Sequence, residues 1–395
     1  MLSAHTISVV QATVPALQQH GEAITRHFYR LMFEQHPEVK AFFNEAHQAS
    51  GTQARALAHA VMAYAQHIEH LDALAGALPR IVQKHAALGI QPEHYPIVGK
   101  CLLQAIREVL GDAATDEVID AWGQAYQSLA DLLIAAEEEV YATHAALPGG
   151  WRGERTFRVA RRQVESELIT SFYLEPVDGG ALQIFQPGQY LTLVLQVEGR
   201  SLRRNYSLSD APSRPWYRIS VKREARGVAS NWLHDHATVG TTVNALPPCG
   251  DFVLDTTKTQ RPLLLVTGGV GITPAISMLE SVASSGRPIR FVHAARHGGV
   301  HAFRSRVDEL TRTHPNVQAL YVYDQPRPDD RPHATGVVDT DLLAAQLPAD
   351  RDVDLYFLGP KPFMQQVYTS GLALGITPDR LRYEFFGPLE PLQAA

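Results

Sequence analysis

The chain has 395 residues, enough for two or three domains at about 150 residues each. Hydrophobic residues make up 45% of it and its formal net charge is −6, so we expect a globular protein with no electrostatic attraction to nucleic acid or to an anionic membrane, and we look for small-molecule chemistry. The two cysteines fit a reducing cytosol, the N-terminus has no signal-peptide pattern and no apolar window reaches the ~18 residues of a membrane span, so we expect a cytoplasmic protein.

The first part of the chain, residues 3–143, is predicted to be helical. Ala, Leu, Gln and Glu dominate it, and apolar residues recur every three or four positions. No strand-like alternation interrupts the pattern, and the prolines fall mostly where helices should start or stop. We therefore predict an all-α domain over residues 1–140.

The pattern changes after a Pro-Gly-Gly break at 148–150. Short β-branched runs bounded by turns follow at 157–161, 168–175, 190–196 and 217–222, which is typical of a small antiparallel β-barrel and predicts one over residues 151–258. From residue 259 to 395, apolar runs at 262–266, 289–294, 320–323 and 355–358 alternate with helical stretches. That alternation predicts an α/β domain with a parallel sheet and helices on both faces.

One histidine lies on the apolar face of a predicted helix. His85 shares that face with Leu78, Ile81, Val82 and Leu88. The helix alone leaves two interpretations open. The more frequent one is a core histidine bonded to a backbone carbonyl; the other is an axial haem ligand, which also needs an imidazole nitrogen inside a dry pocket.

Two other helical stripes each carry a polar residue. Glu137 continues the stripe of the last helix, where a carboxylate is unfavourable unless it is paired; a solvated helix end is the alternative. Gln53 is the one amide on a stripe that includes Leu57. The aromatic pairs Phe28-Tyr29 and Phe42-Phe43 stand at plausible pocket positions, although such pairs are more often core.

Together these residues resemble a known family. Phe42-Phe43-Asn44, Gln53, Leu57, Lys84-His85 and Pro92-Glu93-His94-Tyr95 are similar to the globin domain of flavohaemoglobins, over the whole domain. The resemblance implies that His85 is the proximal iron ligand of haem b, and that Tyr95 and Glu137 hydrogen-bond around it. Such a network makes the imidazole more anionic and favours O–O activation. Lys84 matches a family position thought to influence redox poise.

The same resemblance implies a distal pocket around Tyr29. The hydroxyl of Tyr29 would donate to dioxygen, and Leu57 would crowd the sixth coordination position. Gln53 stands where an oxygen-storage globin usually has a histidine. Phe28 and Phe43 complete the predicted pocket, which is also a candidate site for a lipid.

A second motif predicts a flavin site. Pro187-Gly188-Gln189-Tyr190 leads into a strand and is followed by Arg204-Asn205-Tyr206-Ser207. Arg204 can clamp a phosphate bidentately, and Tyr206 shares its strand face, so that its ring can lie against a flavin while Ser207 reaches the ring edge. The alternative is an exposed basic strand end. The pattern resembles the FAD motif of ferredoxin reductases, as does Gly227-Val228-Ala229-Ser230, which should open a helix toward the pyrophosphate.

A glycine-rich turn predicts a nucleotide site in the last domain. Gly268-Gly269-Val270-Gly271-Ile272-Thr273-Pro274 follows an apolar strand and opens a helix, so its backbone can approach a phosphate. It resembles the NAD(P)H lobe of ferredoxin reductases, as does Leu358-Gly359-Pro360, in which Leu358 replaces the cysteine of most relatives. Phe385-Phe386-Gly387-Pro388 resembles the C-terminal aromatic segment that covers the flavin.

The resemblance as a whole implies that electrons pass from NAD(P)H through FAD to haem, and that nitric oxide and O2 become nitrate in a monomeric enzyme. The alternatives are a haem- and flavin-dependent reductase of hydroperoxides, lipid ones included, an oxygen or nitric oxide sensor, and a flavin reductase with a degenerate globin. No third signalling domain is present to serve a sensor, and His85, Tyr95 and Glu137 argue against a degenerate globin. NADH and NADPH both remain open; Arg296, just after the second α/β strand, lies where a 2′-phosphate would be met.

Overall fold

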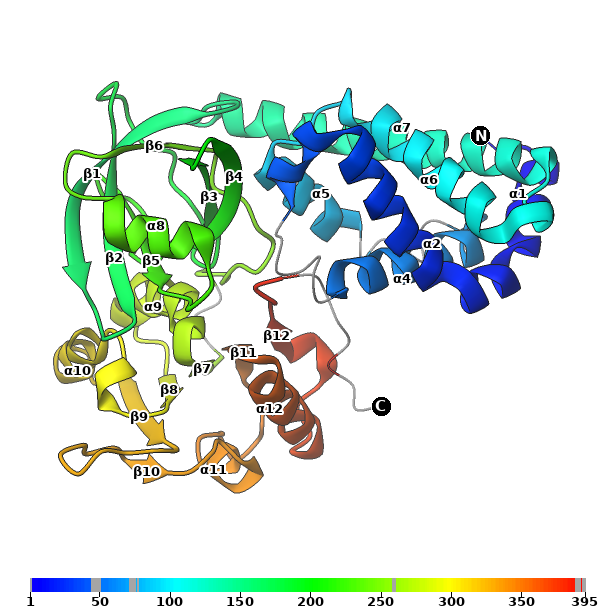
Figure 1. The fold of residues 1–395 in the computed structure, drawn as a ribbon. Coiled ribbons are helices and arrows are strands. Elements are labelled where there is room, and N and C mark those ends of the chain that lie inside the picture. Colours follow the sequence, from blue (N-terminus) through cyan, green and yellow to red (C-terminus); the bar gives the residue numbers. More distant parts are fainter. Residues whose placement is uncertain are drawn as a thin grey trace. The chain divides into compact units, whose positions relative to one another are not determined.

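The computed structural model describes residues 2–43, 51–70, 76, 78–257, 261–387 and 392. Its internal contacts divide the chain into two compact units. The first holds the residues up to Leu147 together with Glu198–Arg204 and Gly387, and the second holds Pro148–Val197 and Asn205–Phe386. The first unit is helical, whereas the second contains two sheets (Figure 1). Each unit is described by itself below.

The helical unit matches the predicted all-α segment. Its helices are α1 (Ala4–Ala12), α2 (Val14–Gln35), η1 (Pro37–Phe42), α4 (Thr52–Gln66), α5 (Leu78–Leu88), α6 (His94–Leu110), η3 (Gly111–Ala113) and α7 (Asp116–Ala146). The side chain of Thr115 accepts a hydrogen bond from the Val118 amide and so caps α7, as expected of a threonine before a helix. The predicted end of the domain at residue 140 falls inside α7, which continues to Ala146. No helix in the described ranges is long and apolar enough to cross a bilayer.

The buried side chains of the helical unit form two separate clusters. The larger one includes Phe28, Tyr29 and Met32 of α2 and Trp122 of α7. The smaller one lies around Val82 of α5, with Tyr95, Ala130 and Leu133. Both clusters contact Tyr126 and Leu129 of α7, so α7 joins them.

The first sheet of the second unit is antiparallel. In space its strands follow the order β4-β3-β6-β1-β2-β5. Their bounds are β1 (Arg155–Val164), β2 (Ile169–Pro176), β3 (Tyr190–Val197), β4 (Arg200–Ser207), β5 (Tyr217–Lys222) and β6 (Thr242–Ala245), and α8 (Val228–His236) accompanies them. Leu208, directly after β4, forms a bridge with Ile219 of β5. This bridge joins the two outer strands, and so closes the sheet toward the predicted barrel.

The second sheet is parallel, in the order β10-β9-β8-β7-β11-β12. Its strands are β7 (Leu263–Gly268), β8 (Ile289–Ala295), β9 (Val317–Tyr323), β10 (Ala334–Thr335), β11 (Asp354–Leu358) and β12 (Leu381–Tyr383). The helices between them are η4 (Gly269–Gly271), α9 (Ile272–Val282), η5 (Ala283–Ser285), η6 (Gly298–Val300), α10 (Arg304–Thr313), α11 (Thr340–Ala344), α12 (Lys361–Ala373) and η7 (Pro378–Arg380). The chain first adds strands on one side of β7 and then returns to its other side. The strand order therefore reverses between β7 and β11.

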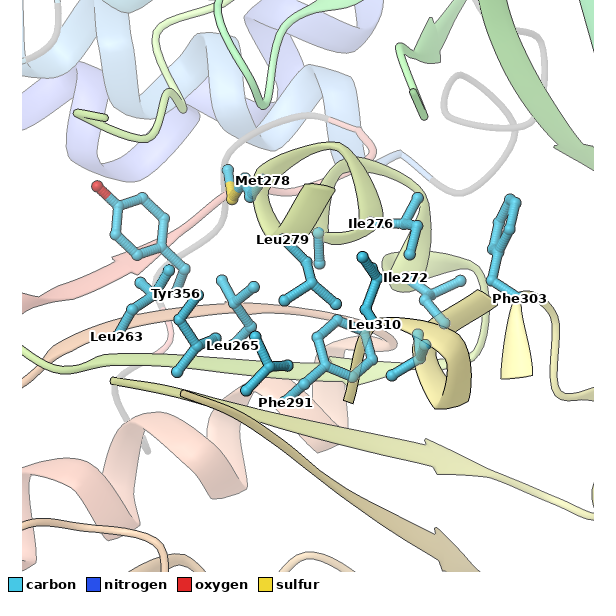
Figure 2. Close-up of a cluster of buried hydrophobic side chains, with 14 of the residues drawn as sticks. Leu263, Leu265, Ile272, Ile276, Met278, Leu279, Phe291, Phe303, Leu310 and Tyr356 are labelled. Carbon is cyan, nitrogen blue, oxygen red and sulfur yellow. The ribbon is translucent and has the colours of Figure 1, made fainter. Parts of the chain in front are cut away.

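Three residues of the antiparallel part pack into the hydrophobic core of the parallel sheet. Figure 2 shows side chains of α9, among them Ile272 and Leu279, lying against Leu265 and Phe291 of the strands. Ile169, Phe252 and Leu254 of the antiparallel part belong to the same buried cluster. The predicted boundary between residues 258 and 259 lies outside the described residues, and the three-domain division stays a prediction.

A charged cluster lies at the amino ends of the parallel strands. Arg287 is almost fully buried, and its guanidinium donates to Asp354 at 2.6 Å and to the Arg261 carbonyl at 2.6 Å. Arg261 and Arg380 also lie within 3.4 Å of the Asp354 carboxylate. A buried arginine needs such a partner, because an unpaired charge in the interior is strongly destabilising.

Candidate cofactor-binding sites

The predicted haem ligand lies in a three-residue hydrogen-bond network. Nδ1 of His85, on α5, is 2.7 Å from Oε1 of Glu137, on α7. The hydroxyl of Tyr95, on α6, donates to the same oxygen at 2.5 Å and lies 3.2 Å from Nδ1. Because a carboxylate only accepts hydrogen bonds, Nδ1 carries the proton and donates a hydrogen bond to Glu137. Helices α5, α6 and α7 each supply one member of the network.

Glu137 is buried, with 2% of its surface exposed. This answers the question left by the sequence, because Glu138 and Glu139 are exposed while Glu137 points inward. Tyr95 is buried as well, and burial followed by the Glu137 carboxylate raises the pKa of its hydroxyl well above the usual range. The Tyr126 hydroxyl donates to the Tyr95 carbonyl at 2.7 Å and so holds the first turn of α6.

The other ring nitrogen of His85 is oriented away from this network. Neither hydrogen bond of the imidazole uses Nε2, and the side chain is 35% exposed. A histidine held through Nδ1 by a carboxylate, whose Nε2 takes part in neither of these hydrogen bonds, has the arrangement of a metal-binding imidazole. The separation of the helical core into two clusters also fits a bulky apolar group between helices. The residues present therefore fit a haem.

The predicted distal residues gather in the larger cluster of the helical unit. The hydroxyl of Tyr29 is buried and hydrogen-bonded to the side chain of Gln53, and burial raises its pKa above the usual range. The Tyr29 ring packs against Phe28 at 4.9 Å and edge-on against Phe43 at 5.7 Å. Leu57, on α4, packs against the same cluster. Lys84 immediately precedes His85 on α5.

The predicted flavin residues come together on two neighbouring strands. Tyr190 begins β3 and is buried, while Arg204-Asn205-Tyr206-Ser207 ends β4. The Thr192 hydroxyl of β3 donates to Oδ1 of Asn205 at 2.9 Å. Tyr190 and Cys249 exchange backbone hydrogen bonds of 2.9 and 3.0 Å, which fixes the start of β3.

The predicted pyrophosphate-binding turn opens α8 as expected. Gly227 is its N-cap residue, and a Cβ there would lie 2.4 Å from the Ser230 Oγ. Ser230 Oγ accepts from the Glu224 amide and donates to the Gly227 carbonyl, both at 3.2 Å. The first-turn amides of Val228, Ala229 and Ser230 have no carbonyl partner within the helix, which is the arrangement that receives a phosphate.

The two predicted nucleotide motifs meet at the carboxyl ends of β7 and β11. Leu358 pairs with Thr267 across the two strands, so the turn that begins at Gly268 lies beside Gly359-Pro360. A Cβ on Gly271 would lie 2.4 Å from the Leu358 carbonyl oxygen, and one on Gly359 would lie 3.2 Å from the Gly268 Cα. Gly269 has φ +54°, a conformation that favours glycine. Gly271 and Gly359 thus lie where two backbones approach closely, whereas Gly269 is favoured by its backbone conformation.

This meeting point is also where the strand order reverses. Ligands of open α/β sheets bind beyond the carboxyl ends of the strands at such a point. There Val270 lies in η4, Ile272, Thr273 and Pro274 form the start of α9, and the Thr273 hydroxyl donates to the Val270 carbonyl at 3.0 Å. The side chain of Leu358 is buried in the cluster around α9.

The predicted C-terminal aromatic segment follows β12. Phe385 packs against Tyr383 at 5.9 Å, whereas half of the Phe386 surface is exposed. The carboxylate of Glu384 raises the pKa of Tyr190, in addition to the larger effect of burial, so this segment runs near the start of β3. Gly387 is described, whereas Pro388 lies outside the described residues.

Two buried histidines were missed by the sequence analysis. His293 of β8 and His301 after η6 have ring centroids 4.4 Å apart, and each Nδ1 is 2.8 Å from a hydroxyl, that of Thr267 or Tyr323. Their Nε2 atoms are buried without a hydrogen-bond partner among the described residues. The signal available was a lone histidine within the apolar run at 289–294.

Comparisons with known proteins agree with a haem site in the first part of the chain, a flavin site in the second and a nucleotide site in the third. Residues 26–133 match the globin family, 158–254 the oxidoreductase FAD-binding domain and 265–369 the oxidoreductase NAD-binding domain. A flavohemoprotein from Burkholderia sp. (strain TH2) is 56% identical, over 99% of this chain and 100% of the relative.

Two solved structures extend the likeness to the fold. A flavohemoglobin from Malassezia yamatoensis, crystallised with bound FAD and heme, has a TM-score of 0.86 at 29% identity and covers 98% of this chain and 100% of its own. The FAD/NAD-binding domain of nitric oxide dioxygenase from Vibrio cholerae has a TM-score of 0.55 at 36% identity and covers 59% of this chain and 99% of its own. The predicted fold class, all-α followed by an antiparallel and then a parallel sheet, is confirmed.

Proposed function

This chain belongs to the flavohemoprotein family, and from that premise we propose that it is an NAD(P)H-dependent nitric oxide dioxygenase with haem b, FAD and NAD(P)H as cofactors. One NAD(P)H, two nitric oxide and two dioxygen molecules give one NAD(P)⁺, two nitrate ions and one proton. The two electrons of the nucleotide account for the two negative charges of the nitrate ions. Its membership and its matched domains make the chain a haem- and flavin-dependent oxidoreductase; the reaction itself is our proposal.

The observation that carries the proposal is the buried Glu137 carboxylate behind His85. It holds the proton at Nδ1 and so leaves Nε2 to bind the iron. Tyr95 donates to the same oxygen and fixes the orientation of the carboxylate. A carboxylate behind a metal-binding histidine raises the basicity of the ligand and favours activation of dioxygen over its storage.

The distal residues suit a small polar substrate in an apolar pocket. Tyr29 offers a hydroxyl donor whose proton is not released, because burial raises its pKa. Gln53 orients that hydroxyl, while Phe28, Phe43 and Leu57 exclude water. A donor placed in a dry site stabilises developing negative charge more strongly than the same donor in water.

The reductase residues have binding and positioning roles. When bound, FAD supplies the conversion between the two-electron nucleotide and the one-electron haem. We assign flavin binding to Tyr190, the run Arg204–Ser207 and the turn Gly227–Ser230, with the C-terminal run Phe385–Pro388 as a cover. We assign nucleotide binding to Gly268–Pro274 and Leu358–Pro360, at the reversal of strand order.

The test is consumption of nitric oxide by the full chain loaded with haem and FAD, in air, with each nucleotide in turn. We expect loss of nitric oxide at an electrode, with matching nitrate and one nucleotide oxidised for every two nitric oxide molecules. His85→Ala should abolish it while NAD(P)H-to-dye activity remains. The surface variant His5→Ala, in the same helical unit, should behave as wild type, because its side chain is 72% exposed.

Two outcomes would contradict the proposal. Nucleotide oxidation that follows added alkyl hydroperoxide, without loss of nitric oxide, would identify a hydroperoxide reductase. Stoichiometric binding of nitric oxide without turnover would identify a sensor.

A further inference from the structure

The carboxyl end of β8 lies next to the predicted nucleotide turn. Strands β7 and β8 are hydrogen-bonded neighbours along their whole length, from Leu263↔Ile289 to Gly268↔Ala294. When a phosphate group sits at the turn after the first strand of such a sheet, the adenosine ribose extends over the end of the neighbouring strand. An acidic residue there accepts from the ribose 2′-hydroxyl of NADH, and an arginine accommodates the 2′-phosphate of NADPH.

Here that position carries an arginine. β8 ends at Ala295, the next residue is Arg296, and residues 294–297 contain no carboxylate. The backbone of Arg296 is fixed, because its carbonyl accepts from the Gln325 amide at 2.8 Å and the Ala295 carbonyl accepts from the Asp324 amide at 3.3 Å. Its side chain is exposed. A fixed backbone with an exposed guanidinium suits the recognition of a phosphate dianion.

The other charges around this end of the sheet are already engaged. Arg327 donates to both oxygens of Glu167, at 2.5 and 2.9 Å, and lowers the pKa of that carboxyl. Asp330 accepts from the amides of Gly298 and Arg327 at 2.9 and 2.8 Å, which lowers its pKa. The positive charge of Arg327 is thus paired with the carboxylate of Glu167, and the carboxylate of Asp330 is satisfied by two backbone amides. The charge of Arg296 also lowers the pKa of Glu167, as a smaller effect than that of Arg327, but no side-chain hydrogen bond or ion pair among the described residues holds its guanidinium.

One nearby acidic residue, Asp324, would favour the ribose 2′-hydroxyl of NADH over the 2′-phosphate of NADPH. Asp324 directly follows β9, which pairs with β8, and its side chain is exposed. It lies one strand further from the glycine-rich turn than Arg296. The ribose therefore reaches the end of β8 before that of β9, and Arg296 is the nearer group.

We propose that Arg296 binds the 2′-phosphate of NADPH and makes NADPH the preferred reductant of this chain. The proposal rests on the function proposed above only in taking a pyridine nucleotide as the electron source. It adds the identity of that nucleotide and the residue that selects it.

The experiment uses the FAD- and haem-loaded full chain and a dye acceptor, so that nucleotide oxidation is measured without nitric oxide. We expect wild type to prefer NADPH in kcat/KM. In Arg296→Ala, kcat/KM for NADPH should fall about 10- to 100-fold, the range for a charge-assisted hydrogen bond, while that for NADH stays within about twofold. Competitive inhibition by 2′-AMP should weaken in parallel, and inhibition by 5′-AMP should not.

Arg290→Ala is the matched control. Arg290 is an exposed arginine near the start of β8, whereas Arg296 directly follows the end of that strand, about 20 Å away. It should leave both nucleotides unaffected. The inference is overturned if wild type prefers NADH, or if Arg296→Ala affects both nucleotides equally. Either result leaves nitric oxide consumption to be decided by its own assay.

Discussion

A single side chain, Glu137, distinguishes the helical unit from an ordinary bundle. Its carboxylate accepts hydrogen bonds from two helices in a place where a polar group is unfavourable unless it is partnered. The sequence showed the stripe that leads to Glu137 but left a solvated helix end open, because the partner Tyr95 lies 42 residues away and only the fold brings it near.

Glu137→Gln tests the role of that carboxylate. The amide keeps the shape but removes the negative charge, so we expect a weaker bond from His85 to the iron and haem release about 10- to 100-fold faster, the usual effect of removing a residue that supports a metal ligand. Transfer of haem to an excess of apomyoglobin measures the rate. Glu139→Gln, an exposed carboxylate on the same helix, is the control. Equal rates in both variants would remove Glu137 from haem binding.

Residue identity alone also failed to indicate which polar groups are buried together. His85 could be proposed because it interrupts an apolar stripe, and the glycine turns because their spacing is local. His293 and His301 were missed, because each looks ordinary in its own segment and their ring contact depends on the end of β8 meeting the loop after η6.

Among the elements, helices α6 and α7 approach closely at one glycine. A Cβ on Gly99 would lie 2.6 and 2.8 Å from ring atoms of Tyr126, and that ring is held by its hydrogen bond to the Tyr95 carbonyl. On α7 itself, a Cβ on Gly123 would meet only Leu103 Cδ1, at an ordinary 3.7 Å. Gly99 is therefore required by the close contact between two helices, whereas no such contact requires glycine at position 123.

Replacing each by alanine should change stability in opposite directions. Gly99→Ala should lower the free energy of unfolding by about 1–3 kcal/mol, because it overpacks the contact. Gly123→Ala should raise it by about 0.5–1 kcal/mol, because alanine is the better helix former. Urea denaturation of the haem-loaded chain, followed by helical circular dichroism, measures both. A neutral Gly99→Ala would show that the Tyr126 ring moves aside.

Prediction of elements from the sequence succeeded where the periodicity was long and failed for short strands. The runs predicted at 157–161, 217–222 and 289–294 lie within β1, β5 and β8. β6 (Thr242–Ala245) was missed, although it lies between β3 and β1 in the sheet. The polar-apolar alternation of β6 covers only four residues, the shortest run that indicates a strand. The two neighbouring strands, which are remote in sequence, define it.

For the whole molecule, the buried histidine pair predicts sensitivity to acid. Burial lowers the pKa of His293 to about 3 and that of His301 further below its usual value. Both folded-state pKa values lie below the unfolded value of about 6.5. Below that pH the unfolded chain takes up protons that the folded chain does not, so stability is full above pH ~6.5 and is lost as pH falls toward ~3.

Each histidine should contribute up to about 1.4 kcal/mol per pH unit below pH ~6. His293→Phe and His301→Phe should therefore each flatten the fall in unfolding free energy between pH ~6 and ~5, measured by urea titration of the full chain. The exposed His5→Phe should leave the slope as in wild type. Identical slopes in all four proteins would show that the buried pair titrates normally.

The contact between the antiparallel part and the core around α9 has a consequence for how such chains are inherited. Ile169, Phe252 and Leu254 belong to the same buried cluster as α9 and the parallel strands. A recombination event that separated the two sheets would expose apolar surface on both products, so they should pass between genes as a single cassette. The Vibrio cholerae domain, which matches both sheets together over 99% of its length, is in keeping with such a cassette.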